Sequence, residues 1–167
     1  MANEIQQLLK TKLFDKDNIR PLIAQWKDQQ QKLVFTNGCF DIVHVGHLNY
    51  LLEASKLGQK LLIGLNSDAS VKRLKGCSRP INGERDRAAL LASLFFVDAV
   101  VLFEEDTPLD LIKAIEPDVL VKGGDYAIDQ IVGAKETLAQ GGSVEILEFL
   151  PGYSTTNIVS KIRGAQE

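Results

Sequence analysis

The chain has only two histidines, His44 and His47, and they lie three positions apart in the stretch FTNGCFDIVHVGHLNY, residues 35–50. If a helix begins between them, one histidine lies at its start and the other in its first turn. Unpaired backbone N–H groups and the positive end of the helix dipole make such a helix start an anion site. Gly38 and Gly46 let the backbone approach a ligand closely. Imidazole N–H groups aimed at phosphate oxygens could stabilise charge that develops in a transition state.

Two other interpretations of this pair stay open. Histidines at positions i and i+3 can ligate a metal ion, and Asp41 or Cys39 could join them as ligands. The pair could also be purely structural. Two spaced histidines are a weak signal, whereas the full pattern G-x-F-D-x-x-H-x-G-H is much stronger. We therefore favour the phosphate site and predict no metal site built from protein ligands.

A second cluster, VKRLKGCSRP at residues 71–80, is basic although the net charge of the chain is −3. Its four cations are Lys72, Arg73, Lys75 and Arg79. Because arginine offers a bidentate fork and lysine a compact charge to phosphate, the cluster could be a mobile phosphate clamp on a loop. A solvated surface face is the alternative. Arg87 follows in a predicted helix, where the alternative role is an ion pair with a neighbour such as Glu84 or Asp86.

Two later segments carry residues suited to a ligand. In GYSTTNIVSKIR, three hydroxyl side chains, at residues 154–156, meet a helix start, and an N-cap explains only one of them. In VLVKGGDY, Gly123 and Gly124 at a strand end permit close approach of a ligand. Asp125 follows them and could cap the next segment or bind a ribose or a cation.

Composition limits the function classes. The chain has 167 residues, 45% hydrophobic and 25% charged, which is typical of one globular domain. The pI near 5.5 argues against a general nucleic-acid binder. Two cysteines without a C-x-x-C pair, and no signal or membrane-spanning stretch, predict a cytoplasmic protein. The patterns GxGxxG, GxxxxGK[ST] and GxSxG are absent, which disfavours dehydrogenases, P-loop kinases and serine hydrolases.

The elements that must position these residues alternate between strand and helix. Five apolar runs predict strands, at residues 32–38, 60–66, 97–103, 117–124 and 143–149. Helical spacing between and after them predicts a Rossmann-like, doubly wound α/β sheet of five parallel strands. In such a sheet, ligands bind beyond the carboxyl ends of the strands, at the switch point in strand order. We expect residues 1–30 to form an N-terminal helical extension and residues 31–167 the domain.

The motif His44-Val45-Gly46-His47, followed much later by Ser154-Thr155-Thr156, resembles the HxGH nucleotidylyltransferase superfamily. The resemblance covers about residues 32–163. The segments FTNGCFDIVHVGH, RPINGERDRAALLASL and PDVLVKGGDY resemble its heptose 1-phosphate adenylyltransferase branch, which serves the lipopolysaccharide core. That branch is often fused to a sugar kinase. The chain is too short to hold one, so the resemblance implies a stand-alone form with a separate heptose kinase as pathway partner, and homodimers among relatives make a homodimer one expectation.

The resemblance also implies roles for individual residues. The catalytic positions are His44, His47, Lys72 and Arg87. The nucleotide-binding positions are Asn37, Gly38, Cys39, Phe40, Gly46, Gly123, Asp125, Gly152, Tyr153, Ser154, Thr155 and Thr156. The positions that bind the sugar phosphate are Asp41, Lys72 and Arg79. Lys72 would bridge the phosphates of the two substrates, and Arg87 would lie near the triphosphate.

The implied reaction joins ATP and heptose 1-phosphate into ADP-heptose and pyrophosphate. Its nucleophile is already an anion, so no general base is needed. Mg²⁺ would be held mainly by the ATP phosphates, with Asp41 as a candidate protein ligand. Three alternatives remain. They are a cytidylyltransferase acting on glycerol 3-phosphate or a phosphoamine, a nucleotide-binding module without turnover, and a metal-binding protein. The segment EFLPGYSTT lacks the arginine that often precedes the S-T-T motif in cytidylyltransferases, which disfavours the first.

Overall fold

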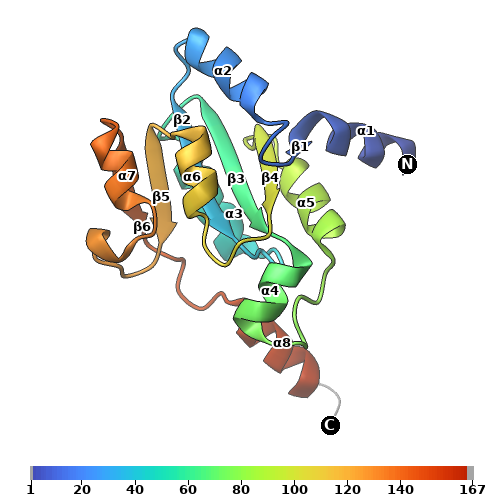
Figure 1. Ribbon diagram of the computed structural model, residues 1–167. Helices are drawn as coiled ribbons and strands as arrows, with labels where there is room; N and C mark the ends of the chain where they lie inside the picture. The colour runs from blue at the N-terminus through green and yellow to red at the C-terminus, as the bar shows by residue number, and fades with distance from the viewer. Residues whose placement is uncertain (1, 165–167) are drawn as a thin grey trace.

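The computed structural model of the chain describes residues 2–164 (Figure 1). Within them, six parallel strands form one sheet in the order β1-β4-β3-β2-β5-β6. The strands are β1 (Leu13–Phe14), β2 (Leu33–Gly38), β3 (Lys60–Asn66), β4 (Ala99–Phe103), β5 (Val119–Gly123) and β6 (Ser143–Leu147). The predicted α/β architecture is confirmed. The predicted number of strands is one too low, because a two-residue edge strand such as β1 is too short to show a periodic pattern.

From β2 to β6, the order of the strands reverses once. From β2 the chain proceeds outward to β3 and β4, and it then returns to the other side of β2 to form β5 and β6. The switch point therefore lies between β2 and its two neighbours, at the carboxyl ends of the strands. The residues that follow β2, β3 and β5 meet there.

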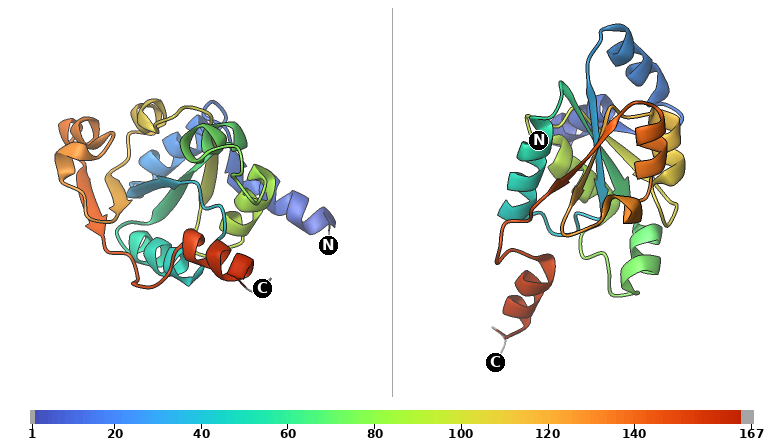
Figure 2. Two further views of the ribbon diagram at one scale, coloured as in Figure 1. Left: turned by 90° about the horizontal axis from the view of Figure 1, so that it is seen from below. Right: turned by 90° about the vertical axis from the view of Figure 1, so that its left-hand side faces the viewer.

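Helices cover both faces of the sheet. They are α1 (Ala2–Lys12), α2 (Arg20–Asp28), α3 (Val45–Ser55), α4 (Asp68–Lys75), α5 (Glu84–Ala92), α6 (Leu109–Ile115), η1 (Ile128–Gln130), α7 (Ala134–Ala139) and α8 (Thr155–Gly164). Figure 2 shows α3 and α5 on one face and α6 and α7 on the other. In Figure 1, α4 and α8 lie beyond the carboxyl ends of the strands, on the side of the switch point.

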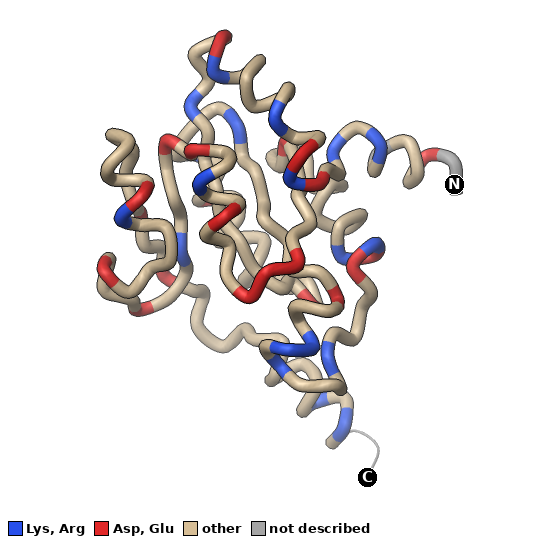
Figure 3. Tube along the Cα trace, viewed as in Figure 1, with Lys and Arg blue, Asp and Glu red and all other residues tan. Residues whose placement is uncertain are grey.

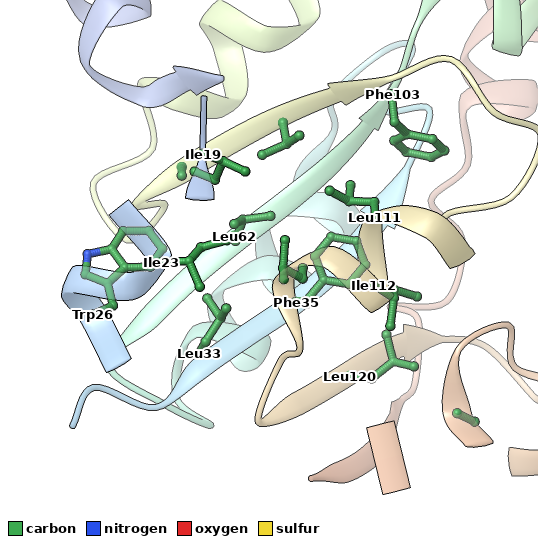
Figure 4. Packing of buried hydrophobic residues seen from close by; sticks show 14 of the residues in the cluster. Ile19, Ile23, Trp26, Leu33, Phe35, Leu62, Phe103, Leu111, Ile112 and Leu120 are labelled. Carbon is green, nitrogen blue, oxygen red and sulfur yellow. The ribbon is translucent and has the colours of Figure 1, made fainter. Parts of the chain in front are cut away.

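Each face of the sheet has its own hydrophobic core. Leu33 and Phe35 of β2 pack on one side with residues of α2 and α6, as Figure 4 shows. Val34, between them, packs on the other side with residues of α3 and α5. Successive side chains of a strand point to opposite faces, so a strand that is covered on both sides must be apolar throughout. This explains the unbroken apolar runs in the sequence.

Part of the first 30 residues belongs to the core that contains Leu33 and Phe35. Ile19, Ile23 and Trp26, from the segment that leads into α2 and from α2 itself, are buried in it. Strand β1 pairs with β4 at the sheet edge. The proposed domain division at residue 30 stays a prediction. The described structure adds that the apolar side of α2 covers the sheet.

One interpretation of the basic segment was a phosphate clamp on a loop, but the first part of the segment is helix α4. Ser67 caps this helix, because its Oγ accepts a hydrogen bond from the N–H of Ser70 at 3.2 Å. Only Ser70 and Val71 of α4 are buried. The helix has only eight residues and a single buried apolar one, Val71, so its basic composition favoured a loop in the sequence.

Candidate active site

A cleft of about 580 Å³ lies at the predicted switch point, over the carboxyl ends of β2, β3 and β5. The starts of α3 and α8, the end of α4 and the loops that follow β4 and β5 complete its wall. Of the residues that the sequence predicted for the site, this wall contains Asn37, Gly38, Cys39, Phe40, Asp41, His47, Gly123 and Thr155. The fold thus brings together residues from both ends of the predicted site.

The histidine pair, His44 and His47, lies at the start of α3. His44 is the N-cap, with extended backbone, and its Nδ1 accepts a hydrogen bond from the N–H of His47 at 3.3 Å. The two rings are stacked, with 3.8 Å between their centroids and 19° between their planes. Since Nδ1 of His44 is an acceptor, the neutral ring carries its proton on Nε2, which is therefore its available donor.

The surroundings keep both rings neutral near pH 7. Burial lowers the pKa of His44. Burial, together with the nearby His44 and Lys75, lowers the pKa of His47 to about 4. Two stacked neutral rings avoid the repulsion that two imidazolium ions would suffer at this distance. A bound phosphate would favour protonation of the imidazoles. The pair can therefore donate hydrogen bonds when neutral and carry positive charge when phosphate is present.

Small residues leave room for these rings. A Cβ added at Gly46 would lie 3.0 Å from Nδ1 of His44 and 3.0 Å from Cβ of Tyr153, so only glycine fits without displacement. Gly123 has a similar role, because a Cβ there would collide with the ring of Phe149. Phe40, with φ of 44°, lies edge-on to His47 with 5.2 Å between ring centroids.

The second motif reaches the same cleft through the start of α8. Thr155 is part of the wall, and its Oγ1 donates a hydrogen bond to the carbonyl of Ile42 at 3.5 Å. Oγ of Ser154 accepts a hydrogen bond from the N–H of Asn157 at 3.0 Å, which is the expected N-cap. The ring of Tyr153 lies 6.5 Å from that of His44. Thr156 is exposed, as is Gly152, where φ is 86°.

Asp41, a predicted substrate ligand, already has partners. It is 2% exposed. Its Oδ2 accepts a hydrogen bond from Nη1 of Arg79 at 2.6 Å, and its Oδ1 accepts from the N–H groups of Ile81 and Asn82 at 2.6 Å and 3.1 Å. Burial alone would raise the pKa of Asp41, but these donors hold it below its usual value. The contacts therefore make Asp41 and Arg79 a clamp between the loop after β2 and the segment before α5.

Arg87 completes what we call the arginine network, namely Arg79, Arg87, Asp41 and Asp68. The side chain of Arg87 is fully buried. Its Nη1 donates to the carbonyl of Cys39 at 2.6 Å, its Nε to the carbonyl of Asn82 at 3.0 Å, and its Nη2 to Oδ1 of Asp68 at 2.8 Å. Its ion-pair partner is thus Asp68, on α4, and not a neighbour in its own helix. A direct contact with a triphosphate stays a prediction, whereas these contacts support the loop that precedes the histidine pair.

The lysines of α4 differ in their relation to the cleft. Figure 3 shows that Lys and Arg gather around α4, α8 and the segment between α4 and α5. Lys75 is part of the cleft wall, whereas Lys72, the predicted catalytic lysine, is exposed outside that wall. Arg73 forms an ion pair with Asp106 at 2.7 Å. The role predicted for Lys72 therefore remains untested, and Lys75 has the position that such a role needs.

Lys122 is a residue of the cleft wall that sequence reasoning missed. It lies in β5, directly before the two glycines, and its Nζ donates a hydrogen bond to Oδ1 of Asn37 at 3.3 Å. The signal was available, because a lysine interrupts an otherwise apolar strand. Asp125, which was predicted, is exposed and lies outside the wall in the described structure.

The described residues offer little to a metal ion by themselves. Among residues 2–164, no group of three or more His, Cys, Asp or Glu side chains could hold one. Asp41 does not fit the ligand role considered for it, since both of its oxygens accept hydrogen bonds from the protein.

Among the described residues, no helix is long and apolar enough to cross a bilayer.

Comparisons with known proteins show the family of the chain. Residues 35–161 match the family described as cytidylyltransferase-like. The bifunctional protein HldE of Methylobacillus flagellatus is 50% identical over 151 residues, which are 90% of this chain and 31% of that protein. HldE of Geobacter sulfurreducens is 52% identical over 151 residues, with the same two shares. The chain therefore spans less than a third of the length of these relatives.

Two solved structures share the fold. The lipopolysaccharide core biosynthesis protein of Thermoplasma volcanium is 31% identical, with a TM-score of 0.57, and the match covers 72% of this chain and 97% of that one. The pantoate-beta-alanine ligase of Francisella tularensis, described as complexed with beta-gamma ATP and beta-alanine, has a TM-score of 0.59 at 13% identity. That match covers 92% of this chain and 77% of the ligase, and it concerns the fold alone.

Proposed function

The chain belongs to the cytidylyltransferase-like family and is a nucleotidyltransferase, and we propose that it transfers AMP from ATP to heptose 1-phosphate. The products are ADP-heptose and pyrophosphate. One observation carries the proposal. Stacked His44 and His47 lie at a helix start beside a cleft at the switch point of a parallel sheet, and Thr155 of the second motif lies in the wall of the same cleft.

The reaction needs little proton transfer. A phosphate oxygen of the sugar 1-phosphate forms a bond to the α-phosphorus of ATP, and the bond from that phosphorus to the bridging oxygen of pyrophosphate breaks. The nucleophile is an anion already, so the protein must position the two substrates and stabilise the charge that moves toward the leaving group. Donors that are fixed before the reaction do this without reorganisation, which suits the histidine pair and the N–H groups at the start of α3.

We assign Mg²⁺ to the phosphates of ATP rather than to a cage of side chains. Mg²⁺ keeps several waters and commonly binds through one or two carboxylates together with substrate phosphates. The groups around the cleft fit this arrangement. Neutral imidazoles, lysine and backbone N–H groups can donate hydrogen bonds to some phosphate oxygens, and other phosphate oxygens would remain free to bind Mg²⁺. When bound, the ion would neutralise charge on the departing pyrophosphate.

The names of the relatives support the choice of acceptor. The relatives from Methylobacillus and Geobacter are called bifunctional, and the Thermoplasma protein is named for lipopolysaccharide core biosynthesis. We infer that this chain also serves that biosynthesis and that a heptose kinase supplies its acceptor.

A homodimer is part of the same proposal and is testable by light scattering in solution.

Pyrophosphate release with a matrix of substrates tests the proposal. ATP and CTP would each be combined with heptose 1-phosphate, another sugar 1-phosphate and glycerol 3-phosphate, with Mg²⁺ present and then removed by chelation. We expect rapid release only with ATP, heptose 1-phosphate and Mg²⁺. Faster release with CTP and glycerol 3-phosphate would replace the proposal by the cytidylyltransferase that the family description also covers.

A further inference from the structure

The cleft has two sides that belong to opposite faces of the sheet. Val119 and Val121 of β5 pack in the core under α3 and α5, and Leu120 packs in the core under α6 and α7. Because side chains alternate along a strand, Lys122 shares its face with Leu120. The histidine pair begins α3 and therefore lies on the other face. Lys122 and the histidine pair thus approach the strand ends from opposite sides.

Lys122 is a half-buried cation without a counter-ion. Its pKa is lowered by burial, against a smaller opposing effect of Cys39. Among residues 2–164 no carboxylate forms an ion pair with its Nζ, whose only described hydrogen-bond partner is the neutral Asn37. The two carboxylates of the cleft wall are already paired, Asp41 with Arg79 and Asp106 with Arg73.

An ammonium group in this position is costly to the protein by itself. Burial of a charge is unfavourable unless a partner of opposite sign accompanies it. Two other half-buried lysines of the described chain have a carboxylate or two carbonyl oxygens as partners. Lys60 is paired with Asp98 at 3.0 Å, and Nζ of Lys12 donates to the backbone carbonyls of Leu94 and Val97. Lys122 has only the neutral side chain of Asn37 and lies in the cleft wall, which indicates that its partner is an anion that comes with a substrate.

We propose that Lys122 binds the phosphate of the acceptor, on the side of the strand ends opposite to the histidine pair. The inference rests on the proposed function, because it assumes a nucleotide on the histidine side. In phosphoryl and nucleotidyl transfer, the attacking and leaving oxygens lie roughly in line through phosphorus. If the histidine pair and the start of α3 hold the triphosphate, the attacking phosphate must arrive from the far side, where Lys122 lies.

Steady-state kinetics and direct binding of Lys122→Met and Lys122→Arg test this inference. Removal of a charged hydrogen bond should raise the KM for heptose 1-phosphate roughly 10- to 100-fold in Lys122→Met, with the KM for ATP changed less than about twofold. Lys122→Arg should recover part of the loss, because a guanidinium also binds phosphate. The matched control is Lys56→Met, since Lys56 is an exposed lysine paired with Glu53 at the end of α3.

Titration calorimetry without turnover separates this inference from the proposed function. Heptose 1-phosphate and Mg-ATP would each be titrated into the wild type and Lys122→Met. We expect weaker binding of the sugar phosphate only. A wild type that binds both ligands but releases no pyrophosphate would refute the proposed function, while the calorimetric difference still decides the role of Lys122. A rise in KM or Kd for ATP alone, equal loss for both ligands, or no sugar-phosphate binding by the wild type would each overturn the inference.

Stability gives an independent check. Since Lys122 has no counter-ion, Lys122→Met should unfold at the same temperature as the wild type or at a higher one. A clear decrease in Tm, together with unchanged KM values, would show that Lys122 is structural.

Discussion

The histidine pair and the arginine network are neighbours at one edge of the sheet, yet their polar atoms have opposite surroundings. The guanidinium of Arg87 donates to two carbonyls and one carboxylate of the protein, and both oxygens of Asp41 accept from protein donors. The histidine rings instead stack on each other, and Nε2 of His44 keeps donor capacity beside the cleft. Polar groups with protein partners support the site, and those without such partners are available to substrate.

The largest effect that tests this contrast is expected at His47. His47→Ala should lower kcat by about 10²–10³, the usual scale for loss of one electrostatic donor to a transition state. The Tm should fall less than for a fully buried residue, because the ring is only partly buried and contacts His44, Phe40 and the backbone of Ile42. Steady-state rates of pyrophosphate release would give kcat, and circular dichroism would give Tm. The contrast would fail if His47→Ala kept near-normal pyrophosphate release.

The arginine network should show the reverse. Arg87→Met removes the buried partner of Asp68 and leaves the carbonyls of Cys39 and Asn82 without their donor. Loss of a buried pair should cost about 3 kcal/mol, toward the low end of the usual range because Asp68 is partly exposed. In a chain of this size we expect Tm to fall by about 6–12 °C.

Arg85→Met, in the same helix but exposed, is the matched control and should change stability by less than about 0.5 kcal/mol. If Arg87→Met kept the wild-type Tm but lost activity through a higher KM for ATP, Arg87 would be a triphosphate ligand after all. That result would restore the role implied by the family resemblance.

A smaller effect separates two lysines of α4. Lys75 lies in the cleft wall and Lys72 does not. Lys75→Ala should therefore raise the KM of a phosphorylated substrate by about tenfold, whereas Lys72→Ala should have a lesser effect. Both residues are exposed, so neither change should alter Tm. Initial rates at varied substrate concentrations would decide, and an opposite order would show that α4 turns toward the cleft when substrate binds.

The last effect is a dependence of stability on pH. The pKa of His47 is about 4 in the folded chain, below its ordinary value of 6.5, so the unfolded chain binds more protons between these values. Stability should thus fall as pH is lowered from about 6.5 toward 4, and His47→Gln should weaken this fall. The lowered pKa of Asp41 acts only at lower pH, below its ordinary value of 3.8. Thermal melts between pH 3 and 8 would test this. If the Tm of the wild type and that of His47→Gln changed equally with pH, the pKa of His47 would not be lowered by burial.

The residues of the site differ in how well the sequence predicted their roles. The sequence alone allowed three features to be assigned to one end of the sheet: the histidine pair, the glycine between them and the S-T-T motif. Their local chemistry and the alternation of strands and helices are both visible in the order of residues along the chain. The resemblance singled out Lys72, and nothing in the sequence indicated that Lys75, three positions later, lies in the cleft wall, because the segment was not predicted to be a helix. Arg87 was read as an ion-pair partner of helix neighbours or a phosphate ligand, and its actual partners lie 5, 19 and 48 positions away.

The sequence by itself determined the parallel α/β sheet, because strands covered on both faces must be apolar along their whole length. It also predicted an anion site, since glycines and paired histidines at a helix start serve that purpose locally. Only the tertiary structure decided which cations are neutralised by protein carboxylates and which remain for a ligand. That distinction depends on distances between residues far apart in the chain, and on the sheet face that each side chain occupies.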